Sequence, residues 1–117
     1  MPPTTSYSFG DVVLVPFPFT NQTQTKQRPA VVVSSSAYNA GRLDVVLMAI
    51  TGQVHTPLEF GETQIAAWQQ AGLVKLSVVK PLVFTLEKPL VIRPLGRLEP
   101  ADRAKLESTL RSILAST

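Results

Sequence analysis

The most informative absence in this sequence of 117 residues is cysteine, of which there is none. Disulfide bonds, thiolate nucleophiles and zinc–thiolate sites are therefore excluded. The chain also lacks an uncharged apolar run of about 18 residues, the length that a membrane-spanning helix needs. Its first residues have neither the basic start nor the apolar stretch of a secretion signal. We therefore expect a cytoplasmic protein with no membrane contact.

Acidic residues are also few, with eight Asp and Glu in all. They form no DxD or HExxH motif and no close carboxylate set, whereas bound divalent ions normally rely on grouped oxygen ligands. We predict that the protein uses no metal and no other cofactor. His55 is the only histidine, so one chain has no histidine pair to act as acid and base. A lone histidine near a strand end is usually an ordinary surface residue, and we leave it out of the expected site.

Positive charge, by contrast, is concentrated in one half of the chain. Residues 1–63 hold three basic and four acidic groups, whereas residues 64–117 hold eight basic and four acidic groups, which gives a net charge of +3. With a pI near 9.6, this charge suits a modest phosphate-binding face. The length favours a single domain over residues 1–117, in which residues 1–8 form a loose lead-in.

The first half contains three short runs rich in β-branched residues, which predict buried strands over residues 11–15, 30–35 and 43–50. Between the first two lies a polar segment without apolar periodicity, residues 16–27, where we expect a mobile loop. Asn39-Ala-Gly41 is a turn signal between the second and third strands, and so short a connection favours antiparallel pairing.

The second half is expected to contain three further strands and two helical segments. Strands are predicted over residues 56–60, 73–79 and 91–95, a helical turn over residues 65–71 that Gly72 ends, and a helix from Pro100 to about Leu114. The spacing gives this helix one apolar face, made of Leu106, Leu110, Ile113 and Leu114. Together the elements predict a mainly β fold: a compact, strongly bent antiparallel sheet, either an SH3-like barrel or an open relative, with a C-terminal α-helix and one short additional helix.

Two sets of side chains in these strands suit nucleic acid. Alternation in the predicted strand 73–79 places Lys75 and Ser77 on one exposed side, near Lys80, where they are suited to contact a polyanion or are simply solvated. Phe17 and Phe19 also alternate, beside prolines. One of them is placed to stack on an unpaired base, although core packing is the more frequent use of such residues.

Two motifs near the N-terminus resemble the start of MazF/PemK toxins, in which a Gly-Asp strand precedes a loop and an Arg-Pro strand. They are Phe9-Gly-Asp-Val-Val-Leu-Val-Pro-Phe-Pro-Phe-Thr20 and Gln27-Arg-Pro-Ala-Val-Val-Val-Ser-Ser35. The resemblance continues in order through Ala49-Ile-Thr51, residues 71–80 and Leu95-Gly-Arg-Leu98, so it spans nearly the whole chain. The sequence departs from the family at Lys80-Pro81, where an Arg followed by a polar residue is frequent, and in residues 21–26.

The resemblance implies the toxin of a type II toxin–antitoxin system, a metal-independent endoribonuclease with an SH3-like barrel that cuts single-stranded RNA at short sequence motifs. It further implies a homodimer that binds RNA across its interface, and a cognate antitoxin whose acidic, disordered tail fills the same groove. The family's catalytic pair is an Arg in the Arg-Pro motif and a Thr or Ser that ends the third strand. This pair corresponds to Arg28 and Thr51.

The chemistry of these two side chains agrees with RNA cleavage by attack of its own 2′-hydroxyl. A guanidinium presents a planar fork to phosphate oxygens but is a poor base at neutral pH, so we expect Arg28 to stabilise phosphoryl charge or to protonate the leaving oxygen. The Thr51 hydroxyl can hydrogen-bond a phosphate oxygen or the 2′-hydroxyl, although without the resemblance it would be taken for an ordinary strand-ending threonine. The expected RNA-binding residues are Phe17, Thr20, Gln27, Gln53, Lys75, Ser77 and Lys80.

Two other functions remain open from the sequence. The first is a non-enzymatic toxin like CcdB, which shares the barrel but acts on a protein target such as a topoisomerase. Such a protein needs no Arg28 and Thr51 pair and relies on its C-terminal residues, which are unremarkable here. The second is an inactive relative that only binds nucleic acid or an antitoxin-like partner, against which the intact pair argues.

Overall fold

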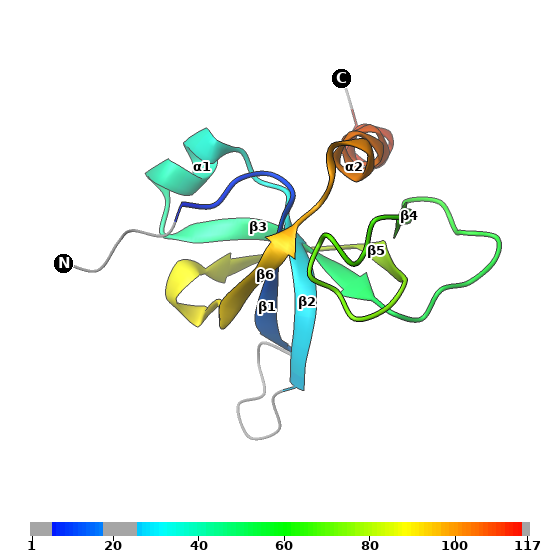
Figure 1. The fold of residues 1–117 in the computed structure, drawn as a ribbon. Helices are drawn as coiled ribbons and strands as arrows, with labels where there is room; N and C mark the ends of the chain where they lie inside the picture. Colours follow the sequence, from blue (N-terminus) through cyan, green and yellow to red (C-terminus); the bar gives the residue numbers. More distant parts are fainter. Residues whose placement is uncertain (1–5, 18–25, 116–117) are drawn as a thin grey trace.

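A computed structural model describes residues 6–17 and 26–115 of the chain (Figure 1). The elements assigned within these residues are, in order, β1 (Asp11–Phe17), β2 (Lys26–Val32), α1 (Ser36–Gly41), β3 (Asp44–Thr51), β4 (Thr63–Ile65), β5 (Ser77–Glu87), the short 3-10 helix η1 (Lys88–Leu90), β6 (Arg93–Arg97) and α2 (Pro100–Ile113).

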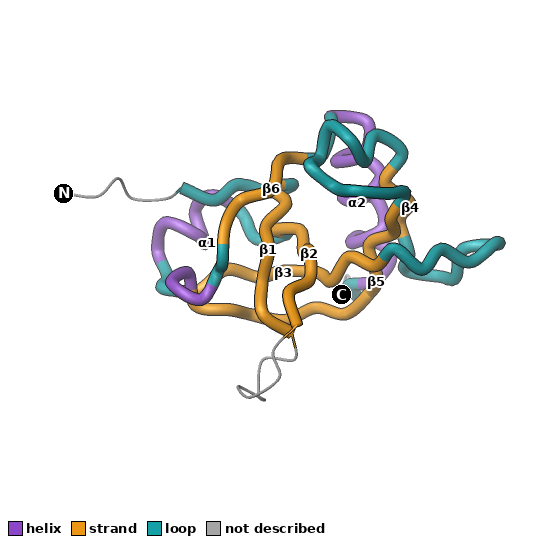
Figure 2. The backbone as a smooth tube through the Cα atoms, turned by 60° about the horizontal axis from the view of Figure 1, so that its bottom comes forward, coloured by secondary structure: helices purple, strands orange, loops and turns teal. Residues whose placement is uncertain are grey.

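The strands form one antiparallel six-stranded sheet in the order β4-β5-β3-β2-β1-β6. The sheet curls into a half-barrel, as the tube in Figure 2 shows. The two outer strands are β4 and β6. The turn at residues 66–72 follows β4 and packs on β6: Gly72 lies so close to Leu95 that a Cβ at position 72 would overlap the Leu95 carbonyl oxygen. The turn therefore links the two outer strands. The expected mainly β fold is confirmed, in its open form.

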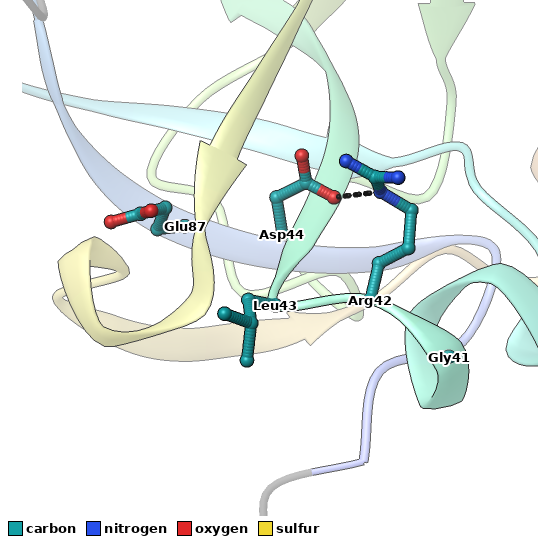
Figure 3. A pocket seen from close by; sticks show the side chains of 5 residues that line it. All are labelled: Gly41, Arg42, Leu43, Asp44 and Glu87. Carbon is teal, nitrogen blue, oxygen red and sulfur yellow. Dashed lines mark hydrogen bonds and ion pairs between the residues drawn. The ribbon is translucent and has the colours of Figure 1, made fainter.

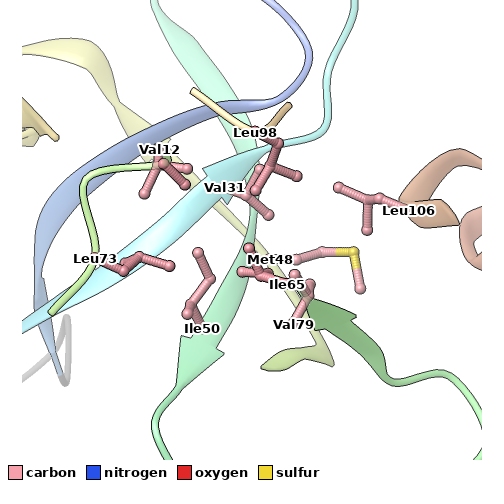
Figure 4. Packing of buried hydrophobic residues seen from close by; sticks show 10 residues of the cluster. Val12, Val31, Met48, Ile50, Ile65, Leu73, Val79, Leu98 and Leu106 are labelled. Carbon is pink, nitrogen blue, oxygen red and sulfur yellow. The ribbon is translucent and has the colours of Figure 1, made fainter. Parts of the chain in front are cut away.

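Buried apolar side chains form two clusters, because strand residues alternate between the two faces of the sheet. The helix-side cluster includes a residue of α2 and is drawn in Figure 4; it contains Val12, Val31, Met48, Ile50, Ile65, Ala71, Leu73, Val79, Leu98 and Leu106. The second cluster contains Val13, Val15, Ala30, Val32, Val45, Leu47 and Leu86. Neighbours along a strand, such as Val12 and Val13, therefore belong to different clusters.

Helix α2 covers the helix-side cluster. It begins at Pro100. Proline suits the first position of a helix, because the N–H groups there make no hydrogen bond within the helix. Leu106 is fully buried, and Leu110 and Ile113 pack against the cluster, which confirms the expected apolar stripe for these three residues. The inclusion of Leu114 was wrong, because this residue follows the last helical residue and is 62% exposed. No helix in the described part of the chain is long and apolar enough to cross a membrane.

A buried carboxylate joins α2 to the turn at residues 66–72. Asp102 accepts hydrogen bonds from the backbone N–H groups of Ala66 (3.2 Å) and Ala67 (2.9 Å). The carboxylate also forms an ion pair with Lys105 (3.2 Å). Asp102 is only 2% exposed, so these bonds replace the water that a buried carboxylate has lost. The start of α2 thereby fixes the turn that links the outer strands.

The short additional helix lies at a different place from the one predicted. Residues 65–71 hold the end of β4 and part of the turn rather than an assigned helix, and Gly72 ends the turn as expected, with a φ of +82°. The short helix is α1, for which we had expected a strand end and a turn. Ser35 caps it, because its hydroxyl accepts a hydrogen bond from the N–H of Tyr38 (3.1 Å), and the side chain of Asn39 within it is buried.

The strand predictions of the first half are confirmed for β1 and β3, and β2 needs a correction. This strand begins at Lys26 instead of residue 30, and Lys26 and Gln27 pair with Phe17 and Pro16 of β1. Part of the expected loop is therefore paired strand. The rest of that loop, residues 18–25, lies outside the described residues, as do residues 1–5 of the expected lead-in.

The strand predicted over residues 56–60 is wrong. That segment has no strand pairing, and the side chain of Phe60 is exposed. Pro57 has no N–H to offer to a sheet. The strand of this region is β4, where Thr63 and Ile65 are buried on either side of the half-buried Gln64.

The alternation predicted for residues 73–79 is also wrong. The segment joins the sheet only at Ser77, and Ser77, Val78 and Val79 are all buried, whereas Val74 is 90% exposed. The strand then continues as far as Glu87, although it contains a proline. The last strand, β6, begins at Arg93, later than the residue 91 expected, because η1 comes before it.

Candidate nucleic-acid interface

Arg28 and Thr51 lie on the same face of the sheet, in neighbouring strands. The pairing of β2 with β3 begins at Ala30 opposite Ala49; Arg28 precedes Ala30 by two positions and Thr51 follows Ala49 by two. Because side chains alternate along a strand, all four belong to one face. Ala30 is part of the second cluster, so this face is the one opposite α2. The fold thus brings the expected pair together at one end of the sheet.

The Thr51 hydroxyl is oriented by the chain that follows it. Thr51 is the last residue of β3, and its Oγ1 accepts a hydrogen bond from the backbone N–H of Gln53 (3.1 Å). This bond uses a lone pair of the oxygen, so the hydroxyl hydrogen is left to be donated to an anion. Arg28 is exposed in β2. The two side chains can therefore supply a planar fork and a hydroxyl donor to the oxygens of one phosphate group.

Two further side chains lie beside Arg28 on this face. In the pairing of β1 with β2, Val15 is opposite Arg28 and Phe17 is opposite Lys26. Directly opposite residues of an antiparallel pair share a face. Phe17 is half-buried at the end of β1, and Lys26 is exposed. Lys26 was not among the expected site residues, because the sequence placed it in a loop. It precedes Arg28 by two positions, which indicates a shared face only once both residues are known to lie in a strand.

Two lysines near β5 lie at the same end of the sheet. The side chain of Lys75 crosses Gly52, the neighbour of Thr51: a Cβ at position 52 would overlap its Cε and lie 3.1 Å from its Nζ. Lys80 lies where the register between β3 and β5 shifts, between the pairs Ile50–Val79 and Met48–Val83. Since Val79 belongs to the helix-side cluster, alternation places Lys80 on the Thr51 face.

We call the group of Lys26, Arg28, Lys75 and Lys80 the cationic end. None of these four side chains has a carboxylate partner within residues 6–17 and 26–115. The four ion pairs of that part of the chain belong to Arg42, Arg97, Lys105 and Arg111. Cations that are not neutralised by the protein produce a positive potential, and a chain of phosphates is the complementary ligand.

The other expected RNA-binding residues are placed less uniformly. Gln27 alternates with its neighbour in β2 and so belongs to the opposite face. Gln53 is exposed beside the strand end. Ser77 is 4% exposed and its hydroxyl donates to the carbonyl oxygen of Lys75 (2.9 Å), so the expectation of an exposed side chain was wrong. Thr20 lies outside the described residues.

A hollow of about 340 Å³ lies at the other end of β3, lined by Gly41, Arg42, Leu43, Asp44 and Glu87 (Figure 3). At about 3.3 Å per strand residue, the start and end of β3 are roughly 23 Å apart. Arg42 Nε donates to Asp44 Oδ1 across 3.1 Å, and this bond holds the pKa of the Asp44 carboxyl below its ordinary value. The hollow is therefore built around a neutralised ion pair and is separate from the cationic end.

The histidine and the acidic residues are possible acid–base groups or metal ligands. His55 is exposed in the segment between β3 and β4. Within the described ranges, no three His, Cys, Asp or Glu side chains gather closely enough to hold a metal ion. The chemistry available at this end is that of a guanidinium, a hydroxyl and ammonium groups.

A half-barrel with an arginine, a threonine hydroxyl and three lysines at one end defines a small β protein suited to hold a polyanion. Comparison with family models is more specific: the model of the PemK-like, MazF-like toxin of type II toxin–antitoxin systems matches residues 8–114. The chain therefore belongs to this family. No curated protein sequence matches it.

Solved structures share the fold at low sequence identity. MazF from Deinococcus radiodurans is 20% identical, with a TM-score of 0.72 over 94% of this chain and 97% of the other. A structure of the MazE–MazF complex of that organism is 20% identical, with a TM-score of 0.73 over 97% of this chain and 100% of the other. A mycobacterial endoribonuclease in complex with its cognate antitoxin is 21% identical, with a TM-score of 0.71 over 97% of this chain and 100% of the other. At such identities the likeness establishes the half-barrel fold.

Proposed function

We propose that this chain is a cytoplasmic endoribonuclease toxin that cuts single-stranded RNA at short sequence motifs without a metal ion. The observation that carries the proposal is the shared face of Arg28 and Thr51 at the cationic end. Membership of the toxin family, and the endoribonuclease named among the structures of the same fold, support it further.

In the proposed reaction the 2′-oxygen of the RNA attacks the neighbouring phosphorus while the bond from phosphorus to the 5′-oxygen breaks. The 2′-hydroxyl gives its proton to water, the leaving 5′-oxygen takes one from water, and the products carry a cyclic phosphate and a 5′-hydroxyl. Arg28 stabilises the charge that develops on the phosphoryl oxygens, and the Thr51 hydroxyl donates a hydrogen bond to one of them. The guanidinium supplies positive charge that other nucleases take from a cation, so the proposed reaction requires no metal.

We further propose a homodimer and an antitoxin partner. Exposed apolar side chains such as Phe60 (79%) and Val74 (90%) supply the kind of surface that a second copy covers. Two of the solved relatives are in complex with antitoxins, and an acidic antitoxin segment is complementary to the cationic end, where it competes with RNA. Light scattering at the concentrations used for cleavage tests the dimer; a monomeric mass there contradicts it.

The test is cleavage of a long single-stranded RNA in excess EDTA by the wild-type protein, Arg28→Ala and Arg111→Ala. Arg111 is a matched control, because it is an exposed arginine on α2 that forms an ion pair with the exposed Glu107 (3.2 Å). We expect the wild type and Arg111→Ala to cut at a short recurring sequence and leave cyclic phosphate ends. Arg28→Ala should be slower by about 100-fold or more, the usual cost of a lost charge-stabilising donor.

Three results would count against the proposal. Cleavage that stops in EDTA and returns with a divalent cation contradicts metal independence. Full activity of Arg28→Ala contradicts the assigned site. If the purified protein cuts no RNA under any condition, the non-enzymatic toxin that acts on a protein target takes its place.

A further inference from the structure

The contact between Lys75 and Gly52 accounts for a glycine that the backbone itself does not require. The glycines with positive φ are Gly10, Gly61 and Gly72. Gly52 lies outside that region, so its conformation is open to any residue. What it lacks is room: a Cβ there would overlap Lys75 Cε and lie 3.2 Å from Cδ. The absence of a side chain at position 52 thus gives the lysine its path.

The backbone of Lys75 is held on both sides, although the side chain is exposed. Leu73 is buried, and its N–H donates to the carbonyl oxygen of Trp68 (3.0 Å). Ser77 is buried, and its hydroxyl donates to the carbonyl oxygen of Lys75 itself (2.9 Å). The neighbours Val74 and Leu76 are exposed and do not anchor the segment. The backbone from which the Lys75 side chain extends is therefore held by the hydrogen bonds of Leu73 and Ser77.

The direction of the side chain matters because of what precedes Gly52. Thr51 ends β3 with its hydroxyl hydrogen unused by the bond from Gln53, and Arg28 lies on the same face. The Lys75 ammonium reaches the residue directly after Thr51, and no described carboxylate forms an ion pair with it. An ammonium carries three donors and a compact charge, so an RNA phosphate is its natural ligand at this position.

We infer that Lys75, seated across Gly52, binds the phosphate next to the one that is cut, and that Gly52 is its positioning residue. The inference rests on the proposed ribonuclease function and deepens it. Ser77 changes its role accordingly: it holds the Lys75 backbone and does not touch RNA. The contact strengthens RNA binding and leaves the chemical step to Arg28 and Thr51.

A double-mutant cycle tests this arrangement with Lys75→Ala, Gly52→Ala and the two combined. The probe is a 2′-O-methylated copy of the RNA segment that the wild type cuts, which binds without reacting. Lys75→Ala should weaken binding about five- to tenfold, the effect of one lost charge-assisted contact. It should also lower the slope of log K against log salt by about 1. Gly52→Ala should weaken binding by a similar factor, because its methyl group displaces the lysine.

The decisive quantity is the effect of Gly52→Ala when Lys75 is already gone. We expect no further loss, within about twofold, because nothing remains for the methyl group to displace. Lys75→Arg should keep the salt slope, and the exposed control Arg111→Ala should change neither slope nor affinity. Single-turnover cleavage at limiting protein should slow in Lys75→Ala by the same five- to tenfold as binding, whereas Arg111→Ala should cut at the wild-type rate.

Two results overturn the inference while the proposed function stands: wild-type affinity and salt slope in Lys75→Ala, or an equal cost of Gly52→Ala with and without the lysine. Cleavage at limiting protein that stays at the wild-type rate in Lys75→Ala also overturns it, because the contact then adds nothing to the binding of the reactive RNA. A wild-type protein that neither cuts nor binds RNA removes the proposed function and this inference together. Lys75→Ala changes an exposed side chain, so the test remains valid even if Gly52→Ala fails to fold.

Discussion

Replacing Gly72 with alanine should destabilise the protein much more than the same change at a glycine whose added Cβ has room, such as Gly41. Gly72 has a φ of +82°, and the new Cβ would overlap the carbonyl oxygen of Leu95 in β6. Left-handed backbone costs a non-glycine residue about 1–2 kcal/mol. Forcing the turn away from β6 adds about 1–3 kcal/mol, the usual cost of overpacking. The expected loss is therefore about 2–5 kcal/mol, against a total stability of about 5–15 kcal/mol for a domain.

The assay is denaturant unfolding at fixed protein concentration, followed by far-UV circular dichroism and by the fluorescence of Trp68, the only tryptophan. A loss of this size lowers the melting temperature by about 8–20 °C in a chain of this length. Gly41→Ala is the matched control, because no described atom beyond its own helix backbone and chain neighbours lies within 4 Å of its added Cβ, and its φ is not positive. If Gly72→Ala unfolds within about 0.5 kcal/mol of this control, the turn does not link the outer strands as described.

Three further variants test other parts of the structure. Asp102→Ala removes a buried carboxylate that accepts from two part-buried backbone N–H groups and should cost about 2 kcal/mol in denaturant unfolding, whereas the exposed control Glu107→Ala should change stability by less than about 1 kcal/mol. Arg42→Gln should raise the pKa of Asp44, followed by NMR titration; because folding lowers this pKa, the stability it contributes is present above about pH 4 and is lost as pH falls through the folded-state value. His55→Ala should cleave RNA at the wild-type rate at every pH.

The elements that sequence patterns predicted best are those whose residues interact mainly with one another or with one large core. Helix α2 followed from Pro100 and the spacing of Leu106, Leu110 and Ile113. Helix α1 did not, because the serines before it fit a strand end as well as a helix cap, and Asn39 is a turn residue unless its side chain is buried. The missing information there is tertiary.

The strand errors have the same origin. Whether residues 73–76 join the sheet depends on the preceding turn at residues 66–72, which packs on β6. That turn is fixed by Asp102, which lies in α2, 35 residues after Ala67 in the sequence. Lys75 and Ser77 were accordingly assigned to one exposed side, when one is exposed and the other buried. No local pattern of the sequence reports such an anchor.

The sequence named candidate site residues but could not give their geometry. Arg28 and Thr51 were named from motif resemblance, but their common face depends on the register of β2 against β3. Lys26 was missed because strand pairing extends into a segment that is polar throughout. The contact of Lys75 with Gly52 joins positions far apart in the sequence, and only the folded chain reveals it.

The way the sheet ends limits how other chains can attach to it. One outer strand, β4, has three residues, and the other, β6, has five, including Pro94, which offers no N–H. The turn at residues 66–72 also lies against Leu95 and Gly96 in β6. Such edges are poor templates for an added strand, so the protein should resist edge-to-edge aggregation when it accumulates. A peptide partner must recognise side chains on its faces instead of extending its backbone ladder.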